Sequence, residues 1–133
     1  DIMATCAAIA DAELPNNAAE DSFNILPILL GEATENIREF TLHQTIRLDL
    51  AIRSGDWKYL DHKGSGGNRY ERENLKPFAL PDNAPDAPGQ LYNLAQDPGE
   101  THNLYFEYPE VAKKLKYQLK QFKTTGRSAP IRR

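Results

Sequence analysis

Residues 40–60, FTLHQTIRLDLAIRSGDWKYL, decide the fold of this chain because apolar residues recur at every second position along most of their length. A period of two is typical of antiparallel β-strands that bury one face. Residues 54–56, Ser-Gly-Asp, interrupt the pattern as a short hairpin turn, and residues 57–60 form the return strand. We therefore predict half-buried strands over 40–53 and 57–60.

A further strand is expected at residues 90–94, after a long segment without periodicity. This segment, residues 62–89, is rich in Gly, Asn, Asp and Pro, and loops of such length inside a compact domain are usually functional or mobile. The glycines of residues 64–67 could cradle an anion on backbone amides, but no Lys-Ser/Thr pair follows them and they open no helix. A flexible connector is the favoured interpretation.

The residues after this strand carry turn chemistry. Asp97 can accept hydrogen bonds from the amides that follow it, and Pro98 presets φ at the next position. Together with Glu100 and Asn103, Asp97 is predicted to fix how the chain leaves the strand and enters a helix.

An amphipathic helix is expected to begin at Pro109, a residue tolerated at the first helical position, and to end at Gly126. One apolar stripe should face the sheet while lysines fill the opposite face, and the tail beyond Gly126 is predicted to be loose. The stripe consists of Val111, Leu115, Leu119 and Phe122.

Two short helical segments are expected near the N-terminus. Asp1 has the character of an N-cap, and Asp21 is predicted to cap a second, apolar turn that ends before Gly31. The predicted fold class is therefore α+β, with an antiparallel sheet of about four strands packed against the C-terminal helix. In the helical segment that follows Asp1, the apolar residues at helical spacing are Ile2, Met3, Cys6, Ile9 and Ala10.

Size and charge narrow the classes of partner. The chain has 133 residues and a net charge of −3, so its overall field steers neither nucleic acid nor an anionic membrane, and neither is expected as a partner. A single cysteine, Cys6, excludes an internal disulfide and a cysteine-rich zinc site. No apolar run approaches the length of about 20 residues that spans a bilayer. The basic residues near the C-terminus are interpreted as a solvated helix face and a basic tail: Lys113, Lys114, Lys116, Lys120, Lys123, Arg127, Arg132 and Arg133.

Two strings in this order resemble the C-terminal part of the formylglycine-dependent sulfatases. Residues 51–60, AIRSGDWKYL, are similar to a family phrase like "aiR-x-G-x-WKy", and residues 91–104, LYNLAQDPGETHNL, are similar to "qLYdL-x-x-DP-x-E-x-x-NL". Residues 1–10 and 20–31 resemble the family's "D-x-x-PT-x-x-x-x-ag" and "lDG-x-S-l-x-P-x-L-x-G". The resemblance implies that residues 1–37 form a linker and helical segment at the end of the large sulfatase domain, and that 38–133 form the C-terminal α+β subdomain.

The resemblance implies no catalytic residue and no metal ligand on this chain. The family uses a Cys or Ser, oxidised to formylglycine within Cys/Ser-x-Pro-x-Arg, and a calcium ion. The sole cysteine, Cys6, is followed by Ala-Ala-Ile, and the carboxylates are dispersed among strands and loops. Formylglycine and calcium are therefore expected in an N-terminal catalytic domain that precedes this chain and acts as its partner, and the chain alone is expected to be inactive.

His43 is the candidate substrate-binding residue. It lies in a predicted strand on the face opposite Phe40, Leu42 and Leu48. In some carbohydrate sulfatases the equivalent strand carries histidines that face the substrate, and Thr-Leu-His-Gln resembles their "vHhS". The alternative is a solvent-exposed strand histidine without a function.

Other polar and aromatic residues have structural interpretations. His62 opens the long loop and His102 lies inside the turn, so both are weaker candidates than His43. Trp57 is expected in the core, since it alternates with another aromatic residue along its strand. Arg53 and Lys58 are expected to be exposed cross-strand charges.

As part of an intact sulfatase, the chain is expected to support the hydrolysis of sulfate esters of carbohydrates or aryl compounds. It would contribute stability and substrate specificity without the nucleophile, in a periplasmic or secreted enzyme. The apolar N-terminal segment predicts self-association of the isolated chain, or disorder before about residue 35. The alternative is a free-standing, non-catalytic binding or interaction module with the same fold.

Overall fold

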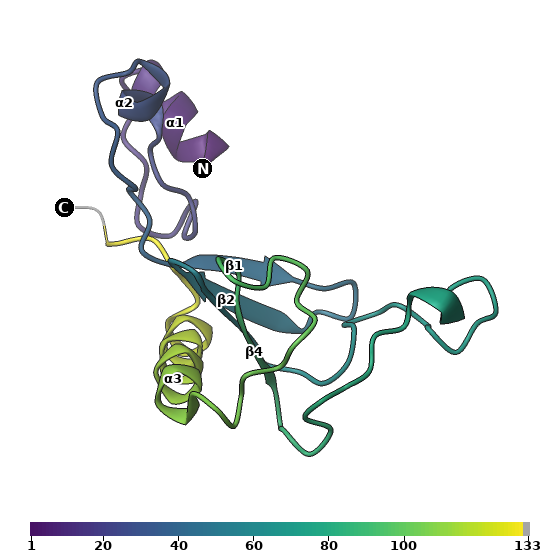
Figure 1. The fold of residues 1–133 in the computed structure, drawn as a ribbon. Helices are drawn as coiled ribbons and strands as arrows, with labels where there is room; N and C mark the ends of the chain where they lie inside the picture. The colour runs from purple at the N-terminus through teal and green to yellow at the C-terminus, as the bar shows by residue number, and fades with distance from the viewer. Residues whose placement is uncertain (132–133) are drawn as a thin grey trace. The chain divides into compact units, whose positions relative to one another are not determined.

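The computed structural model describes residues 1–131, so that Arg132 and Arg133 of the predicted basic tail lie outside the described residues. The chain forms two compact units, one of residues 1–39 with residues 120 onward, and one of residues 40–119. The α+β class is confirmed: four antiparallel strands, a C-terminal helix and two short N-terminal helices (Figure 1). No helix within residues 1–131 is both long and apolar enough to cross a membrane.

The sheet has the strand order β1-β2-β3-β4, with every neighbouring pair antiparallel. The predicted turn at residues 54–56 is confirmed, because β2 and β3 are joined there and Gly55 takes a φ of 55°, a conformation that favours glycine. The strands are β1 (Thr41–Gln44), β2 (Leu50–Ser54), β3 (Trp57–Leu60) and β4 (Gln90–Asn93).

Residues 45–49 are a turn, and the expected strand pattern through them was wrong. The amide of Thr45 donates to the carbonyl of Asp49 at 2.9 Å, and the Thr45 hydroxyl accepts from the amides of Arg47 and Asp49. Ile46 and Leu48 are consequently 90% and 72% exposed. The alternation of apolar residues continues through this turn, so periodicity alone could not reveal it.

The core lies on one face of the sheet, where α3 (Pro109–Thr125) packs. Ile52, Tyr59 and Leu91 are directly opposite one another across three strands and are fully buried. Trp57 projects to the same face as Tyr59 and contacts Tyr108, the residue before α3, at 5.0 Å between ring centroids. Trp57 is only half-buried, because it lies at the end of its strand rather than in the centre of the core.

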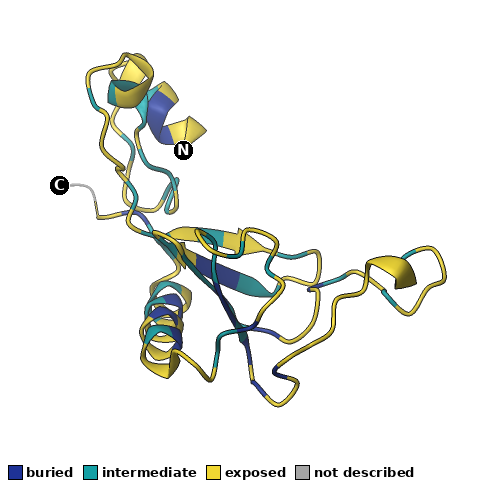
Figure 2. Ribbon diagram, in the orientation of Figure 1, coloured by how far each residue is buried: buried dark blue, intermediate teal, exposed yellow. Residues whose placement is uncertain are grey.

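The buried side of α3 matches the prediction in its centre and differs at its ends. Leu115 and Leu119 are buried as expected, Val111 and Phe122 are only half-buried, and Ala112 is buried although it was not predicted (Figure 2). Gly126 follows the helix with a φ of 68°, as expected for a C-terminal glycine.

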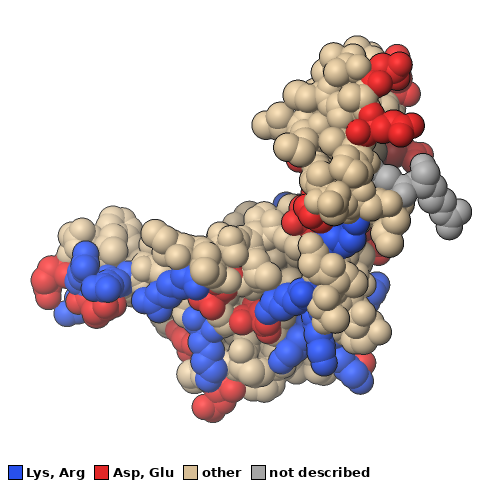
Figure 3. All heavy atoms as spheres, turned by 180° about the vertical axis from the view of Figure 1, so that it is seen from behind, with Lys and Arg blue, Asp and Glu red and all other residues tan. Residues whose placement is uncertain are grey.

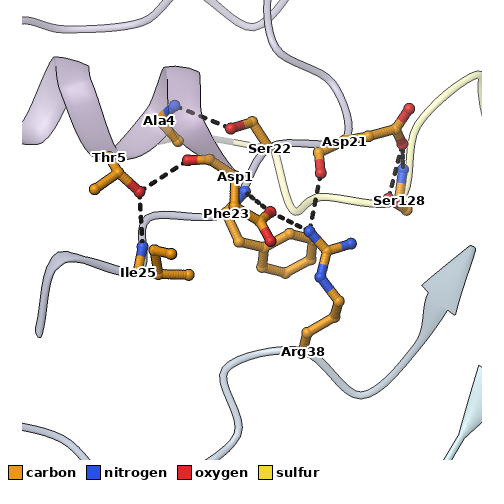
Figure 4. Close-up of polar contacts among 9 residues, drawn as sticks. All are labelled: Asp1, Ala4, Thr5, Asp21, Ser22, Phe23, Ile25, Arg38 and Ser128. Carbon is orange, nitrogen blue, oxygen red and sulfur yellow. Dashed lines mark hydrogen bonds and ion pairs between the residues drawn. The ribbon is translucent and has the colours of Figure 1, made fainter. Parts of the chain in front are cut away.

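Arg127, Ser128 and Ala129, which follow Gly126, are held by hydrogen bonds, which contradicts the prediction of a loose tail for these residues. The Arg127 guanidinium donates to the carbonyl of Asn16 at 2.9 Å. The amide and hydroxyl of Ser128 both donate to Asp21 Oδ1 at 2.7 Å (Figure 4). These contacts belong to the first compact unit.

The N-terminal helices α1 (Ile2–Ile9) and α2 (Leu26–Leu29) exist, but their ends differ in part from the prediction. Asp1 precedes α1 as expected, yet its carboxylate forms an ion pair with Arg38 and accepts from the amide of Phe23 (Figure 4). Asp21 does not cap α2, because that helix starts five residues later and the Asp21 carboxylate binds Ser128.

The apolar residues that were expected to line α1 are mostly exposed. Ile2, Met3 and Ile9 are 80%, 57% and 65% exposed, while Ala4 and Thr5 are buried. In α1, the Thr5 hydroxyl accepts from the amide of Ile25 at 3.1 Å, which ties this helix to α2. The first unit therefore presents an apolar surface to its surroundings.

The turn after β4 has the structural role predicted for it. Asp97 accepts from the amides of Thr101 and His102 at 2.7 and 2.9 Å. Partial desolvation acts to raise the pKa of Asp97, and these hydrogen bonds outweigh it and lower the pKa below its ordinary value. Asn103 is buried, and its Oδ1 accepts from the amides of Leu91 and Tyr105.

The segment between β3 and β4 contains a single short helical turn, η1 (Lys76–Phe78), among its described residues. Figure 1 shows this segment extending beyond the strands to which it is joined. Its C-terminal part is fastened to the turn after β4: the Asn103 amide donates to Asn83 Oδ1 at 2.8 Å, and Asn83 Nδ2 donates to the Asn103 carbonyl at 3.0 Å.

Candidate functional site

The face of the sheet opposite the core borders a cavity of about 460 Å³. The strand register places His43, Ala51, Leu60 and Gln90 in one row across this face, because residues directly opposite one another in antiparallel strands project to the same side. The segment between β3 and β4 and the turn after β4 supply the other walls. The volume falls within the range of about 300–1,000 Å³ that is typical of small-molecule sites.

His43 lies at this cavity, on the opposite face from Leu42. Desolvation lowers the pKa of His43 below its ordinary value of 6.5, and the positive charges of Lys58 and Arg53 lower it further, while Glu100 acts in the other direction. The imidazole is therefore neutral near pH 7. A neutral imidazole offers one hydrogen-bond donor and one acceptor, which suits a hydroxyl group better than an anion.

Lys58 and Glu100 form an ion pair at the same cavity. Their side chains meet at 2.6 Å, and they are only 19% and 29% exposed. Lys58 is thus not the exposed cross-strand charge that was expected, whereas Arg53 is exposed and its Nε donates to the carbonyl of Gly55. Glu100 has a φ of 53°, which is uncommon for a residue with a side chain.

Gln90 and Tyr92 complete the polar wall. Gln90 Nε2 donates to the carbonyls of His62 and Gly64 at 3.0 and 2.8 Å, so it holds the start of the long loop. The Tyr92 hydroxyl donates to Gln90 Oε1 at 2.7 Å. Burial, together with the nearby carboxylates of Glu100, Asp82 and Asp97, raises the pKa of Tyr92 to about 12.

His62 is buried beside this cavity. Its Nδ1 lies 3.2 Å from the carbonyl of Lys63, and within the described part of the chain its Nε2 is the one buried side-chain nitrogen or oxygen without a hydrogen-bond partner. Gly66 packs against this ring, since a Cβ at Gly66 would lie 3.0 Å from His62 Cε1 and 2.4 Å from Thr45 Cγ2. The glycine cluster therefore has a packing role that the connector interpretation missed.

His102 does not contribute to the cavity, and no metal centre is apparent in the described chain. His102 is exposed and pairs with Glu107 at 2.8 Å. Within residues 1–131, the His, Cys, Asp and Glu side chains form no group of three or more that could hold a metal ion. On the face seen in Figure 3, basic and acidic side chains are interspersed over the lower part of the view, while the upper part, with the N-terminal helices, shows acidic ones.

The string Ser128-Ala129-Pro130-Ile131-Arg132 also fits the letters Ser-x-Pro-x-Arg, a match that the sequence analysis overlooked. The structure describes its first four residues, and there the Ser128 hydroxyl is occupied as a donor to Asp21. Ala129 is buried and its amide donates to the carbonyl of Glu20 at 2.9 Å. These contacts give Ser128 and Ala129 a structural role in fastening the segment that follows α3.

Among the residues that line the cavity, the sequence predicted a ligand contact only for His43. The pairing of Lys58 with Glu100 joins residues 42 positions apart, which no local pattern reveals. For Gln90, the available signal was its place on the same face of the sheet as His43 once the strands are aligned.

Comparison with known proteins shows which family the chain is similar to. No protein-family profile matches the chain. An N-acetylgalactosamine-6-O-sulfatase of Bacteroides thetaiotaomicron is 34% identical over 93% of the chain and 23% of that protein. Arylsulfatase A of Bos taurus is 32% identical over 91% of the chain and 24% of that protein.

Solved structures agree with the sequence comparisons. A structure described under the metabolism of multiple glycosaminoglycans by Bacteroides thetaiotaomicron shares 34% identity and a TM-score of 0.72, over 93% of this chain and 24% of that one. A second structure, Ps i-CgsB, has a TM-score of 0.57 at 21% identity, over 91% of this chain and 23% of that one, and shows the fold alone.

The chain spans about a quarter of the length of the relatives it matches, while more than nine tenths of the chain takes part in the two matches described above. This is the relation expected between a subdomain and a whole enzyme, and it confirms the resemblance found in residues 51–60 and 91–104. The chain belongs to the sulfatase family and corresponds to the C-terminal subdomain of a larger sulfatase.

Proposed function

We propose that this chain serves an enzyme that hydrolyses sulfate esters, and that its cavity receives the leaving-group side of the substrate. The observation that carries the proposal is the similarity to sulfatases over nearly the whole chain. The cavity on the face of the sheet opposite the core supports it, because a leaving group that differs between substrates needs a wall outside the reacting centre.

His43 is the substrate-binding residue in this proposal. Its lowered pKa keeps the imidazole neutral at pH 7, so that it can donate to or accept from a hydroxyl of the leaving group. The neighbouring Lys58 is occupied by Glu100, which leaves the cavity without an unpaired cation from Lys58. These features favour a hydroxyl-rich leaving group over a second anionic one.

The proposal assigns bond cleavage to the remainder of the enzyme. The described residues offer no metal-binding cluster, and the hydroxyl of Ser128 is bound to Asp21. We accordingly assign formylglycine and calcium to a larger N-terminal domain, and we expect the whole enzyme to be periplasmic or secreted. In this proposal the exposed apolar residues of the first unit pack against that domain. They are Ile2, Met3, Ile9, Leu29 and Leu30.

The experiment compares two substrates in the full-length enzyme. His43→Ala is expected to lower kcat/KM for a sulfated carbohydrate much more than for 4-nitrophenyl sulfate, because the small aryl group does not reach the proposed contact. His102→Ala is the matched control, since His102 is an exposed histidine that does not line the cavity. Equal losses on the two substrates would remove His43 from the leaving-group site.

A second measurement tests the division of labour. The purified chain supplied with calcium is expected to hydrolyse no sulfate ester, since cleavage requires a nucleophile and preorganised charge around the sulfate. Turnover above background that disappears in Ser128→Ala would overturn this assignment and place the nucleophile on the chain itself.

A further inference from the structure

The cavity has two unlike walls. The sheet contributes polar groups, among them His43 and Gln90, while the segment between β3 and β4 contributes Phe78, Leu80 and Pro81. Phe78 and Leu80 are 69% and 58% exposed. An aromatic ring that lines a cavity and is left open to solvent is poorly explained by core packing, because most of its apolar surface is not buried.

The backbone around Phe78 is ordered by local hydrogen bonds. The amide of Phe78 donates to the carbonyl of Leu75 at 2.9 Å, and the amides of Leu75 and Lys76 donate to the carbonyl of Arg72. These successive turns form η1, which ends at Phe78. A ring on an ordered turn loses less conformational freedom when a ligand packs on it than a ring on an unstructured loop does.

The base of this segment is also fastened to the rest of the second unit. Asn83 exchanges two hydrogen bonds with the backbone of Asn103. Within the segment, Lys63 Nζ donates to the carbonyl of Pro85 at 3.0 Å and so joins its two ends. The wall that carries Phe78 is thus tied at its C-terminal base to the turn that bears Glu100, which belongs to the polar part of the cavity.

A cavity with one polar and one aromatic wall has the chemistry of a pyranose site. The hydroxyls at the ring's edge can pair with imidazole, amide and carboxylate groups, while its C–H face, with a partial positive charge, suits the negative face of an aromatic ring. A simple aryl group would stack as well, but it would offer no hydroxyl to the imidazole of His43, and leaving a desolvated polar group without a hydrogen bond is costly.

We propose that Phe78 is the stacking platform for a pyranose ring bound between the loop and the free face of the sheet. This inference rests on the proposed function and deepens it, because it selects a carbohydrate over an aryl leaving group and names a specificity-determining residue. Leu80 extends the platform on the same wall, and His43 contacts the hydroxyls from the opposite one. Gln90 supports that wall, because its Nε2 donates to the carbonyls of His62 and Gly64.

The test measures binding of unsulfated sugars to the full chain, with no catalysis required. The probes are the methyl glycosides of galactose, glucose, N-acetylgalactosamine and N-acetylglucosamine, and galactitol serves as an open-chain polyol without a ring face. We expect at least one glycoside to bind with NMR shift changes at both His43 and Phe78, and galactitol to bind more weakly than that glycoside.

Variants then separate stacking from general effects on the fold. Phe78→Ala should weaken glycoside binding about two- to tenfold, the range for one aromatic contact, whereas Phe78→Trp should retain it. Phe106→Ala is the matched control. Like Phe78, Phe106 is an exposed phenylalanine of the second unit, with 60% of its surface open to solvent, but it does not line the cavity. Unchanged resonances of α3 in each variant show that the fold is intact.

Two results would overturn the platform. One is glycoside binding of equal strength in Phe78→Ala and the unchanged chain, and the other is the absence of binding by all four glycosides. Neither result decides the proposed function, which depends on turnover by the full-length enzyme and on the two-substrate comparison for His43. If the full-length enzyme showed no sulfatase turnover while the chain still bound a glycoside through Phe78, the proposed function would be rejected and the stacking role of Phe78 would stand.

Discussion

Replacing Asn103 with alanine should be among the most damaging single changes to the second unit. Asn103 is 4% exposed, and its Oδ1 accepts from the amides of Leu91 and Tyr105 at 3.0 and 3.1 Å. Its Nδ2 also donates to the carbonyl of Gly89 at 3.3 Å. Alanine can make none of these bonds, so the amide of the fully buried Leu91 would lose its partner.

The magnitude follows from the groups left behind. A buried donor without a partner costs about 1–3 kcal/mol, and the amide of Leu91 should pay most of that penalty. Tyr105 is half-buried, so its amide can recover a bond to water at a smaller cost. We therefore expect Asn103→Ala to lower the free energy of unfolding by about 2–4 kcal/mol, a large share of the roughly 5–15 kcal/mol typical of a domain.

Asn83→Ala is the matched control for this prediction. It removes the two bonds from Asn83 to the backbone of Asn103 but leaves the buried bonds of the Asn103 side chain intact, and Asn83 is itself exposed. Its expected cost is therefore about 0.5–1.5 kcal/mol. Urea unfolding followed by the fluorescence of Trp57 measures both variants. Equal losses, or a loss below about 1 kcal/mol for Asn103→Ala, would refute the reasoning from buried amides.

Three further predictions follow from the same contacts. Leu115 is 3% exposed on α3, and Leu115→Ala should lower the free energy of unfolding by about 2–5 kcal/mol. A decrease below about half a kcal/mol in urea unfolding would contradict the packing of the helix. Asp97→Ala should cost about 1 kcal/mol. Because the folded pKa of Asp97 lies below its ordinary value of 3.8, its contribution is present above about pH 4 and lost as pH falls through the folded pKa, so unfolding of Asp97→Asn should depend less on acid. Lys58→Met should raise the pKa of His43 by removing a nearby positive charge, and an unchanged NMR titration of His43 would show that this charge does not reach the imidazole.

Elements whose signals are local in the sequence were predicted well. The hairpin between β2 and β3 needed only the Ser-Gly-Asp turn and the apolar residues on either side of it. The helix from Pro109 to Thr125 needed its stripe and the glycine that follows it. Within α3, Ala112 was missed because a small residue adds little to an apolar pattern, although its position next to Leu115 buries it.

The prediction of the fold was wrong where a side chain turns the local backbone, or where it binds a backbone amide distant in the sequence. Thr45 turns the chain between β1 and β2 with its hydroxyl, while Ile46 and Leu48 keep up the strand pattern around it. Asp21 has the residue type of a helix cap, yet its carboxylate binds Ser128, 107 positions later. Residue type alone cannot distinguish these roles, because the same oxygen serves a cap, a turn or a distant amide.

The candidate site depends on the same kind of distant contact, and this explains why His43 was the one residue predicted for it from the sequence. The loop from β3 to β4 has no periodicity because its C-terminal base and its start are held by Asn83 and Gln90 rather than by a ladder of backbone pairs. Changes at either residue should therefore shift the wall that bears Phe78 without removing any group assigned to the ligand. Under the proposed function, specificity at this cavity would depend on the loop's attachments as much as on the residues that line it.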